Sequence, residues 1–518
     1  MMMKRVFPAL LALLFCLTAG GVKAAPAKDF RVKGFHIDMK VQTMTPEALK
    51  AFARDLSGLG INAILMEWEG TFPFDRNAVV SNRHAYTPAE VREFIDYCSG
   101  LGIDVIPLQQ TFGHVEYILQ HDRYAPLREN FRSEFSQVCP LDPASERIFK
   151  GIVEEVAAAH PSPYFHIGCD ETFLLGLCPK CRAYVKQYGK SRLFVDYVAK
   201  ICRIVSDLGK RPILWADIIT KYPEAVDRLP KDAILMDWNY GWDIKHFGDI
   251  DKLYASGLEI WGAPALRSDP DTHYLITWNT HFDNQRDYIP YCREAGYQGI
   301  VMTSWSASGL YGLFFENKNE VALIDAVRQV YPNNGFRLLL AMYAEAVRQS
   351  EPIDPRGFTV GYARERFGLS RQEGERLWEM LAEPPVRFKF GKPMGRGNTV
   401  ESALETGRRN REMLRRMKPR RNVREFEHFR LQADLRQQYL EFKAVDSAYN
   451  APDFDRSKAP ALLAQLEQRV LSQTPDLDRR FAELNGDFLK PGEIDYQNRM
   501  RNRKMEHTHR TLKALVQR

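Results

Sequence analysis

Short apolar runs alternate with helical patterns along the chain from about residue 30 to residue 310. Two of the helical patterns, residues 45–60 and 87–102, open with Thr-Pro and close on Gly, which are start and stop signals for helices. The eight apolar runs begin at Phe30, Asn62, Ile103, Tyr164, Arg211, Ala233, Leu258 and Gly299. Eight strands with intervening helices in about 280 residues match the count and length of a (β/α)8 barrel, an α/β fold.

Beyond about residue 330 the pattern becomes helical and highly charged. We therefore expect a catalytic barrel over residues 25–330 and an all-helical C-terminal domain over residues 331–518. The most basic stretch, residues 415–424, has Glu nearby at helical spacing, which favours a solvated helix face. The net charge is only +6, from 72 basic and 66 acidic residues, so no nucleic-acid partner is expected. A homodimer formed through the helical region is left open.

The first 24 residues have the organisation of a secretory signal peptide. A basic start is followed by an apolar run and by the small-residue cleavage site Val22-Lys23-Ala24. The apolar run is short for a membrane span, and no other stretch is long and apolar enough for one. We expect export to the periplasm or the extracellular space after cleavage, with no membrane span.

Cysteine usage does not indicate a disulfide framework. Eight cysteines include Cys16 in the signal segment, so an odd number remains: Cys98, Cys139, Cys169, Cys178, Cys181, Cys202 and Cys292. The single C-x-x-C formed by Cys178 and Cys181 is compatible with half a zinc site, a local disulfide or two thiols. A structural zinc needs four ligands and no second C-x-x-C follows, so the sequence favours no metal and no cofactor.

The ends of the predicted strands are polar or aromatic. In a barrel these ends meet at the one face where the chemistry of this fold occurs. Trp215, Trp238 and Trp305 end the fifth, sixth and eighth strands, and such rings beside carboxylates suit a carbohydrate pocket. The competing interpretation is that strand ends are polar because they are exposed and that indoles fill the barrel interior.

Two adjacent carboxylates, Asp170 and Glu171, follow the fourth strand in the run HIGCDET. A retaining glycosidase normally places two carboxyl groups about 5 Å apart across the sugar, and an inverting one places them farther apart. Neighbouring residues cannot easily flank a sugar in this way. From one side, one acid can protonate the leaving oxygen while the other holds a nucleophilic group of the substrate. This substrate-assisted scheme requires a 2-acetamido sugar.

Two other classes of function remain open at this point. One is a metal-dependent hydrolase, for which ligand types are available at His36, Asp38, His114, His166 and Asp170. No H-E-x-x-H or comparable ligand spacing appears, which makes this the weaker alternative. The other is a carbohydrate-binding barrel whose catalytic chemistry has been lost.

The run from His166 to Glu171 resembles the H-x-G-x-D-E motif of glycoside hydrolase family 20, the β-N-acetylhexosaminidases. The segments FHIDMK, ILMEWEGTFPF and VIPLQQTFGHVEYILQH resemble more closely its hexosaminidase D-like branch. The likeness covers roughly Arg31 to Asn317. It implies a (β/α)8 barrel and a retaining, substrate-assisted exo-β-N-acetylhexosaminidase that removes terminal β-linked GlcNAc or GalNAc.

The resemblance also implies residue roles. Glu171 would be the general acid and then the base, and Asp170 would orient the acetamido group and stabilise an oxazolinium-like intermediate. His114 would work with an acid from the second strand, for which Glu69 is preferred over Glu67. The residues expected to bind substrate are Asp38, Trp215, Asp217, Trp238, Tyr240, Trp305 and Tyr311, with the Tyr240 hydroxyl directed to the acetamido oxygen.

The chain departs from the family at the residues that grip the outer sugar hydroxyls. The first strand offers Lys33 where the larger branch has Arg, and the eighth strand reads Trp305-Ser306-Ala307 where that branch has W-x-E. The hexosaminidase D-like branch has an Arg-Tyr-Asp-His-like run after this Trp, of which only Tyr311 stays in register. The choice between GlcNAc and GalNAc is therefore left open.

Overall fold

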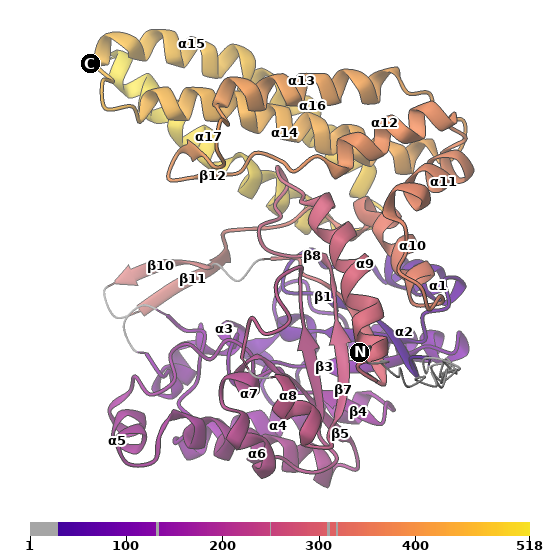
Figure 1. Ribbon diagram of the computed structural model, residues 1–518. Helices are drawn as coiled ribbons and strands as arrows, with labels where there is room; N and C mark the ends of the chain where they lie inside the picture. The colour runs from indigo at the N-terminus through magenta and orange to yellow at the C-terminus, as the bar shows by residue number, and fades with distance from the viewer. Residues whose placement is uncertain (1–28, 131–133, 249, 308–310, 318–319, 518) are drawn as a thin grey trace, which may run out of the picture.

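The computed structural model describes residues 29–130, 134–248, 250–307, 311–317 and 320–517 (Figure 1). The predicted signal peptide lies outside these residues. Within them, no helix is sufficiently long and apolar to cross a membrane.

Eight parallel strands close into a barrel, and each begins within a few residues of a predicted start. They are β1 (Val32–Asp38), β2 (Ala63–Glu67), β3 (Asp104–Leu108), β4 (Tyr164–His166), β5 (Arg211–Trp215), β6 (Ile234–Trp238), β7 (Glu259–Ala263) and β9 (Gly299–Ser304). Neighbours pair in chain order, and β1 pairs with β9 to complete the ring. The predicted (β/α)8 barrel is confirmed. A short strand that was not predicted, β8 (Ala265–Arg267), adds to β9.

The helices that alternate with the strands begin where the sequence signals predict. In α1 (Pro46–Gly58) the Thr45 hydroxyl accepts a hydrogen bond from the Ala48 amide. In α2 (Pro88–Gly100) Thr87 and Glu90 form a complete capping box. The other helices of the barrel region are α3 (Glu116–Leu119), α4 (Pro143–Ala159), α5 (Pro179–Tyr188), α6 (Lys190–Asp207), α7 (Asp217–Lys221), α8 (Ile250–Ala255), α9 (Trp278–Glu294) and α10 (Arg337–Ala346).

The interior of the barrel is a packed core. The side chains that fill it are Val32, Ala63, Leu65, Ile106, Leu108, Ile213, Trp215, Ile234, Met236, Trp261, Ala263 and Val301. A larger apolar cluster lies between the strands and the surrounding helices. The strands are thus buried on both faces, which explains their nearly continuous apolar sequence.

The C-terminal region is mostly helical and lies as a layer against one end of the barrel (Figure 1). Its helices are α11 (Pro355–Phe367), α12 (Arg371–Ala382), α13 (Val400–Arg416), α14 (Val423–Tyr449), α15 (Ala459–Arg469), α16 (Thr474–Asn485) and α17 (Pro491–Gln517). The expectation of an all-helical region is wrong in one detail, because β12 (Phe388–Lys389) and β13 (Lys392–Pro393) form a small antiparallel hairpin. Gly391 at its turn has a positive φ of 77°, which permits the tight reversal.

A second hairpin, β10 (Tyr311–Asn317) and β11 (Glu320–Ala326), follows β9 and projects from the side of the barrel (Figure 1). The helical layer contacts the chain that follows β1. The Lys490 amide donates to the Thr43 carbonyl, and Glu493 accepts a hydrogen bond from the Gln42 amide. The layer therefore packs at the barrel end where the strands terminate.

Candidate active site

The barrel register brings the ends of its first four strands together. Asp38 at the end of β1 is level with Glu67 at the end of β2, and Glu67 is level with Leu108 of β3. Leu108 is in turn level with His166 of β4. Residues just beyond these positions therefore converge at one face, as parallel barrel geometry requires.

His114 joins the two adjacent carboxylates that follow β4. Its Nε2 atom lies 3.3 Å from Asp170 Oδ2 and 3.2 Å from Glu171 Oε2. The Asp170 side chain is buried, whereas that of Glu171 is 36% exposed. Asp170 Oδ1 is also buried and has no hydrogen-bond partner among the described residues. One acid thus faces inward with a free oxygen, and the other reaches toward the open end of the barrel.

The charges of His114 and Asp170 stabilise each other. Burial opposes protonation of His114, but the Asp170 carboxylate outweighs it and raises the pKa of His114 well above the usual value. Burial likewise opposes ionisation of Asp170, and the charge on His114 outweighs it, so the pKa of Asp170 is lowered. At neutral pH this is an imidazolium beside a carboxylate.

The backbone is strained at three residues that follow the ends of barrel strands. Glu69, His114 and Glu171 have φ values of 46°, 53° and 46°, in the left-handed region that few non-glycine residues adopt. Each follows a different barrel strand. Such strain persists only where surrounding contacts over-determine the conformation, and it concentrates at functional sites.

A glycine is required at position 168 in HIGCDET for a steric reason. Gly168 has a φ of 72°, and a Cβ atom there would lie 1.8 Å from Gln110 Oε1. The chain after β4 can therefore approach the chain after β3 closely only because residue 168 has no side chain. This approach brings Asp170 and His114 within contact distance.

Aromatic side chains gather at the ends of β5, β6 and β9. Trp305 Nε1 donates a hydrogen bond of 2.8 Å to the Tyr240 hydroxyl. The ring centroids of Trp215 and Trp305 are 6.0 Å apart, and those of Trp238 and Tyr240 are 5.1 Å apart. Trp215 belongs to the barrel core, whereas Trp238 and Trp305 are half-buried. The interior-filling interpretation therefore applies to Trp215, and the other two indoles line the mouth of the barrel.

Asp217 supports the chain at Glu171. Its Oδ2 atom accepts a hydrogen bond of 3.2 Å from the Glu171 amide, while its buried Oδ1 has no partner among the described residues. Burial, reinforced by the negative charge of Asp170, raises the pKa of Asp217 to about 7. Asp217 is thus a carboxyl group that changes protonation near neutral pH.

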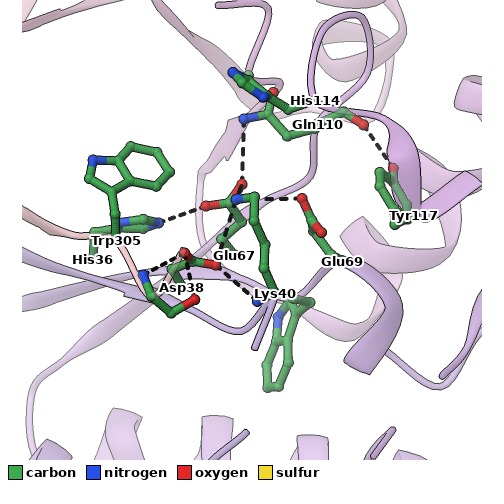
Figure 2. Close-up of polar contacts among 12 residues, drawn as sticks. His36, Asp38, Lys40, Glu67, Glu69, Gln110, His114, Tyr117 and Trp305 are labelled. Carbon is green, nitrogen blue, oxygen red and sulfur yellow. Dashed lines mark hydrogen bonds and ion pairs between the residues drawn. The ribbon is translucent and has the colours of Figure 1, made fainter. Parts of the chain in front are cut away.

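The buried ammonium of Lys40 is the main charge that the sequence analysis missed. It is hydrogen-bonded to Glu67, lies 3.4 Å from Glu69 and 3.6 Å from Asp38, and sits 5.1 Å from the ring centroid of Trp305 (Figure 2). Burial opposes its charge, but the carboxylates outweigh burial and raise the pKa of Lys40 well above the usual value. In the sequence, this charge could have been recognised as a Lys two residues beyond the end of the first strand.

Lys33, which the sequence analysis placed opposite the family's Arg, lies elsewhere. It is near the start of β1, and its Nζ atom pairs with Asp29 Oδ2 at 2.7 Å. A residue near the start of a parallel strand lies at the barrel end opposite the strand termini, so Lys33 does not take the place of the Arg of the larger branch.

No contact between His114 and Glu69, the preferred acid from the second strand, appears among the described residues. Glu69 begins a 3-10 turn (Glu69–Thr71), and its side chain points toward Lys40 (Figure 2). Burial raises the pKa of Glu69 well above the usual value despite the attraction of Lys40. The second choice, Glu67, pairs with His36 Nε2 at 2.9 Å and with Lys40. His114 instead contacts the acids of the fourth strand.

Asp38 is held by its neighbours. Its Oδ2 atom accepts hydrogen bonds of 2.8 Å from both the amide and the hydroxyl of Ser306, and Oδ1 accepts one from the Lys40 amide. It therefore links the ends of β1 and β9. Tyr311 is half-buried, and burial together with the charges of Glu69 and Glu116 raises its pKa well above the usual value.

The five residues considered as ligands of a catalytic metal do not form one cluster. His36 pairs with Glu67, and His166 Nδ1 accepts a hydrogen bond from the Gly168 amide. Over the described part of the chain, the only group of three or more potential ligands is Glu129, Cys139, Cys178 and Cys181, none of which was in that set.

Comparison with known proteins gives consistent matches. Residues 64–305 match the model of the glycosyl hydrolase family 20 catalytic domain. Hexosaminidase D of Bos taurus is 28% identical over 295 residues, which cover 52% of this chain and 83% of that protein. Hexosaminidase D of Homo sapiens is 27% identical over 309 residues, which cover 55% of this chain and 62% of that protein.

Among solved structures, the β-N-acetylhexosaminidase of Bacteroides fragilis aligns with a TM-score of 0.48 and 18% identity, covering 68% of this chain and 71% of that one. The family match falls on the barrel and includes the acidic pair after β4. Residues 64–305 therefore carry a glycosyl hydrolase family 20 catalytic domain, which makes the protein a glycoside hydrolase.

Proposed function

We propose that the protein is an exo-β-N-acetylhexosaminidase that removes terminal β-linked GlcNAc or GalNAc with retention, through an oxazolinium intermediate formed by the substrate's acetamido group. The carrying observation is that His114 Nε2 contacts both Asp170 and Glu171, so the two acids work from one side of the site. Two carboxylates on one side suit substrate assistance better than attack by an enzyme nucleophile.

The different exposure of the two acids assigns their roles. Glu171, the more exposed, protonates the leaving oxygen and then removes a proton from the attacking water. Asp170 is buried and ionised, with Oδ1 free to accept the acetamido N–H. Its negative charge stabilises the positive charge that develops as the oxazoline ring closes.

In this proposal, the aromatic side chains at the ends of β6 and β9 form the surface on which the sugar binds. Trp238 and Trp305 are half-buried at the ends of β6 and β9, the barrel face at which the acids also lie. The Tyr240 hydroxyl, oriented by Trp305, donates to the acetamido oxygen in this proposal. The Lys40 ammonium lies beside the same Trp305 ring and, with Tyr311, supplies polar contacts to the outer hydroxyls in place of the larger branch's Arg and Glu.

The test is substitution of the proton donor. Glu171→Gln keeps the size of the side chain and removes its acid function, so release of 4-nitrophenol from the β-GlcNAc and β-GalNAc glycosides should fall at least about 100-fold. The matched control is Glu146→Gln on the outside of α4, which should keep full activity. A thiazoline analogue of the intermediate should inhibit the active wild-type enzyme.

Two outcomes would contradict the proposal. Full activity of Glu171→Gln would remove the assigned acid. Binding of N-acetylhexosamines by the wild-type protein without turnover of either glycoside would favour the alternative of a binding barrel.

The signal-like segment at residues 1–24 supports a further proposal, that the protein acts after export. Cell fractionation combined with N-terminal sequencing tests it. Recovery of the full-length chain in the cytoplasm would contradict export.

A further inference from the structure

Three cysteines and a glutamate come together outside the active site. Glu129 and Cys139 lie in the connection between β3 and α4, and Cys178 and Cys181 lie at the start of α5. All four are buried, and their potential ligand atoms lie within 4.8 Å of one another. The single C-x-x-C of the sequence thus gains two partners from a different connection of the barrel.

The sulfur spacing suits a shared metal ion. Cys139 Sγ lies 3.6 Å from Cys178 Sγ and 3.5 Å from Cys181 Sγ. A tetrahedral zinc with Zn–S bonds of about 2.3 Å holds its sulfurs about 3.8 Å apart, whereas a disulfide joins them at about 2.05 Å. The observed distances are close to the first value and far from the second.

Glu129 supplies a second, independent observation. Its Oε1 atom accepts hydrogen bonds from the amides of Gly176, at 3.1 Å, and Cys178, at 3.0 Å. Its Oε2 atom is buried with no hydrogen-bond partner among the described residues, although the residue is only 1% exposed. A buried carboxylate oxygen without a partner is costly, and a cation among the three thiols would satisfy it.

The C-P-x-C turn fixes the positions of its two sulfurs. Cys178 caps the N-terminus of α5, and its sulfur accepts a hydrogen bond of 3.3 Å from the Cys181 amide. The turn therefore holds Cys178 and Cys181 on the side that faces Cys139.

We propose that Glu129, Cys139, Cys178 and Cys181 bind one zinc ion. Three sulfurs and one carboxylate oxygen suit zinc, and four protein ligands leave no open position, so the site is structural. Cys178 and Cys181 are neighbours in the sequence, whereas Glu129 and Cys139 join them only in the folded chain.

The position of the site indicates a structural role for the ion. Cys139 belongs to the connection that carries His114, and Cys178 follows Asp170 and Glu171 in the next connection. The two connections already touch through the Leu174 amide and Gln137 Oε1, at 3.0 Å. Zinc would lock them together a few residues from the acidic pair. The proposal does not depend on which sugar the enzyme cleaves.

The direct test is metal analysis of the full chain purified from zinc-supplemented cells. Elemental analysis should find one zinc per chain in the wild-type protein and none in Cys178→Ser. The matched control is Cys98→Ser, because Cys98 is equally buried but lies on α2 outside the cluster; it should keep its zinc. The metal-free variant should also melt at a lower temperature than the control.

Because Cys178→Ser could disturb folding, Glu129→Gln provides a second variant. The amide keeps the shape and an acceptor oxygen but loses the charge, so transfer of zinc to a chromogenic chelator should be faster than from the wild type. Co²⁺ added to the zinc-depleted protein should give the visible bands of a tetrahedral thiolate site.

Two results would overturn the proposal. One is a natively folded, reduced wild-type protein that binds neither Zn²⁺ nor Co²⁺. The other is a native protein in which thiol titration and intact mass show a disulfide between two of the three cysteines. Activity is not needed for either measurement, so failure of the zinc site is distinguishable from failure of the proposed reaction.

Discussion

His114 Nε2 lies 3.3 Å from Asp170 Oδ2, and both side chains are largely buried. The contact joins the connection after β3 to the connection after β4. It holds Asp170 as a carboxylate at neutral pH, which is the form needed to stabilise a developing positive charge.

Asp170→Asn tests that charge. The amide keeps the size of the side chain but cannot offset the positive charge of an oxazolinium-like transition state, so kcat for 4-nitrophenyl β-GlcNAc should fall about 100-fold to 1,000-fold. Steady-state kinetics and the affinity of a thiazoline inhibitor are the measurements. An unchanged kcat would show that this carboxylate does not take part in the reaction.

The His114–Asp170 pair should make stability depend on pH. The raised pKa of His114 contributes stability that is complete below the unfolded value of 6.5 and lost as pH rises through the folded value. The lowered pKa of Asp170 contributes stability that is present above the unfolded value of 3.8 and lost as pH falls through the folded value. The contribution is therefore largest from about pH 4 to about pH 6.5 and declines as pH rises from there to the folded pKa of His114.

His114→Gln should remove this contribution. Breaking a buried pair leaves Asp170 without its cation and should lower the free energy of unfolding by about 3 kcal/mol near pH 6, with a smaller loss at alkaline pH. Urea unfolding of both proteins across the pH range measures the difference. A difference that does not vary with pH would assign the loss to packing.

Lys40→Met tests the buried ammonium. Its removal leaves Glu67, Glu69 and Asp38 facing one another, and the free energy of unfolding should fall by about 3 kcal/mol. The matched control is Lys33→Met in β1, whose partner Asp29 is 65% exposed; the expected loss there is below about 1 kcal/mol.

A double variant separates charge from packing at Lys40. Adding Glu67→Gln to Lys40→Met reduces the repulsion and should recover part of the lost stability, as measured by denaturant unfolding. If the double variant recovers no stability, Lys40 stabilises the protein through packing of its aliphatic side chain and not through its charge.

Gly168→Ala tests the close approach behind the acidic pair. The φ of 72° and the contact of an added Cβ with Gln110 should cost about 2 kcal/mol or more and lower activity by displacing Asp170. The control is Gly58→Ala in α1, where an added Cβ meets nothing within 4 Å and should raise stability by up to about 1 kcal/mol. Thermal unfolding and kcat check both, and equal effects at the two sites would contradict the steric argument.

Local patterns in the sequence were sufficient to predict the barrel. Helix caps at Thr45 and Thr87 and the eight apolar runs depend on residues close together in the chain, so they can be recognised without tertiary information. The short strand β8 and the hairpin β12–β13 were missed because each has too few residues to show a period.

The sequence by itself determined which chemistry the chain carries: the adjacent acids Asp170 and Glu171, and aromatic side chains at the strand ends. Only the tertiary structure decided which charges meet. His114 pairs with Asp170 and not with Glu69, and Lys40 meets the acid Glu69 whereas Lys33 pairs with Asp29. Cys178 and Cys181 likewise meet Cys139 and Glu129 only in the fold. These contacts depend on barrel register and on turns with left-handed backbone, which bring together residues far apart in the chain and leave no periodic signal in it.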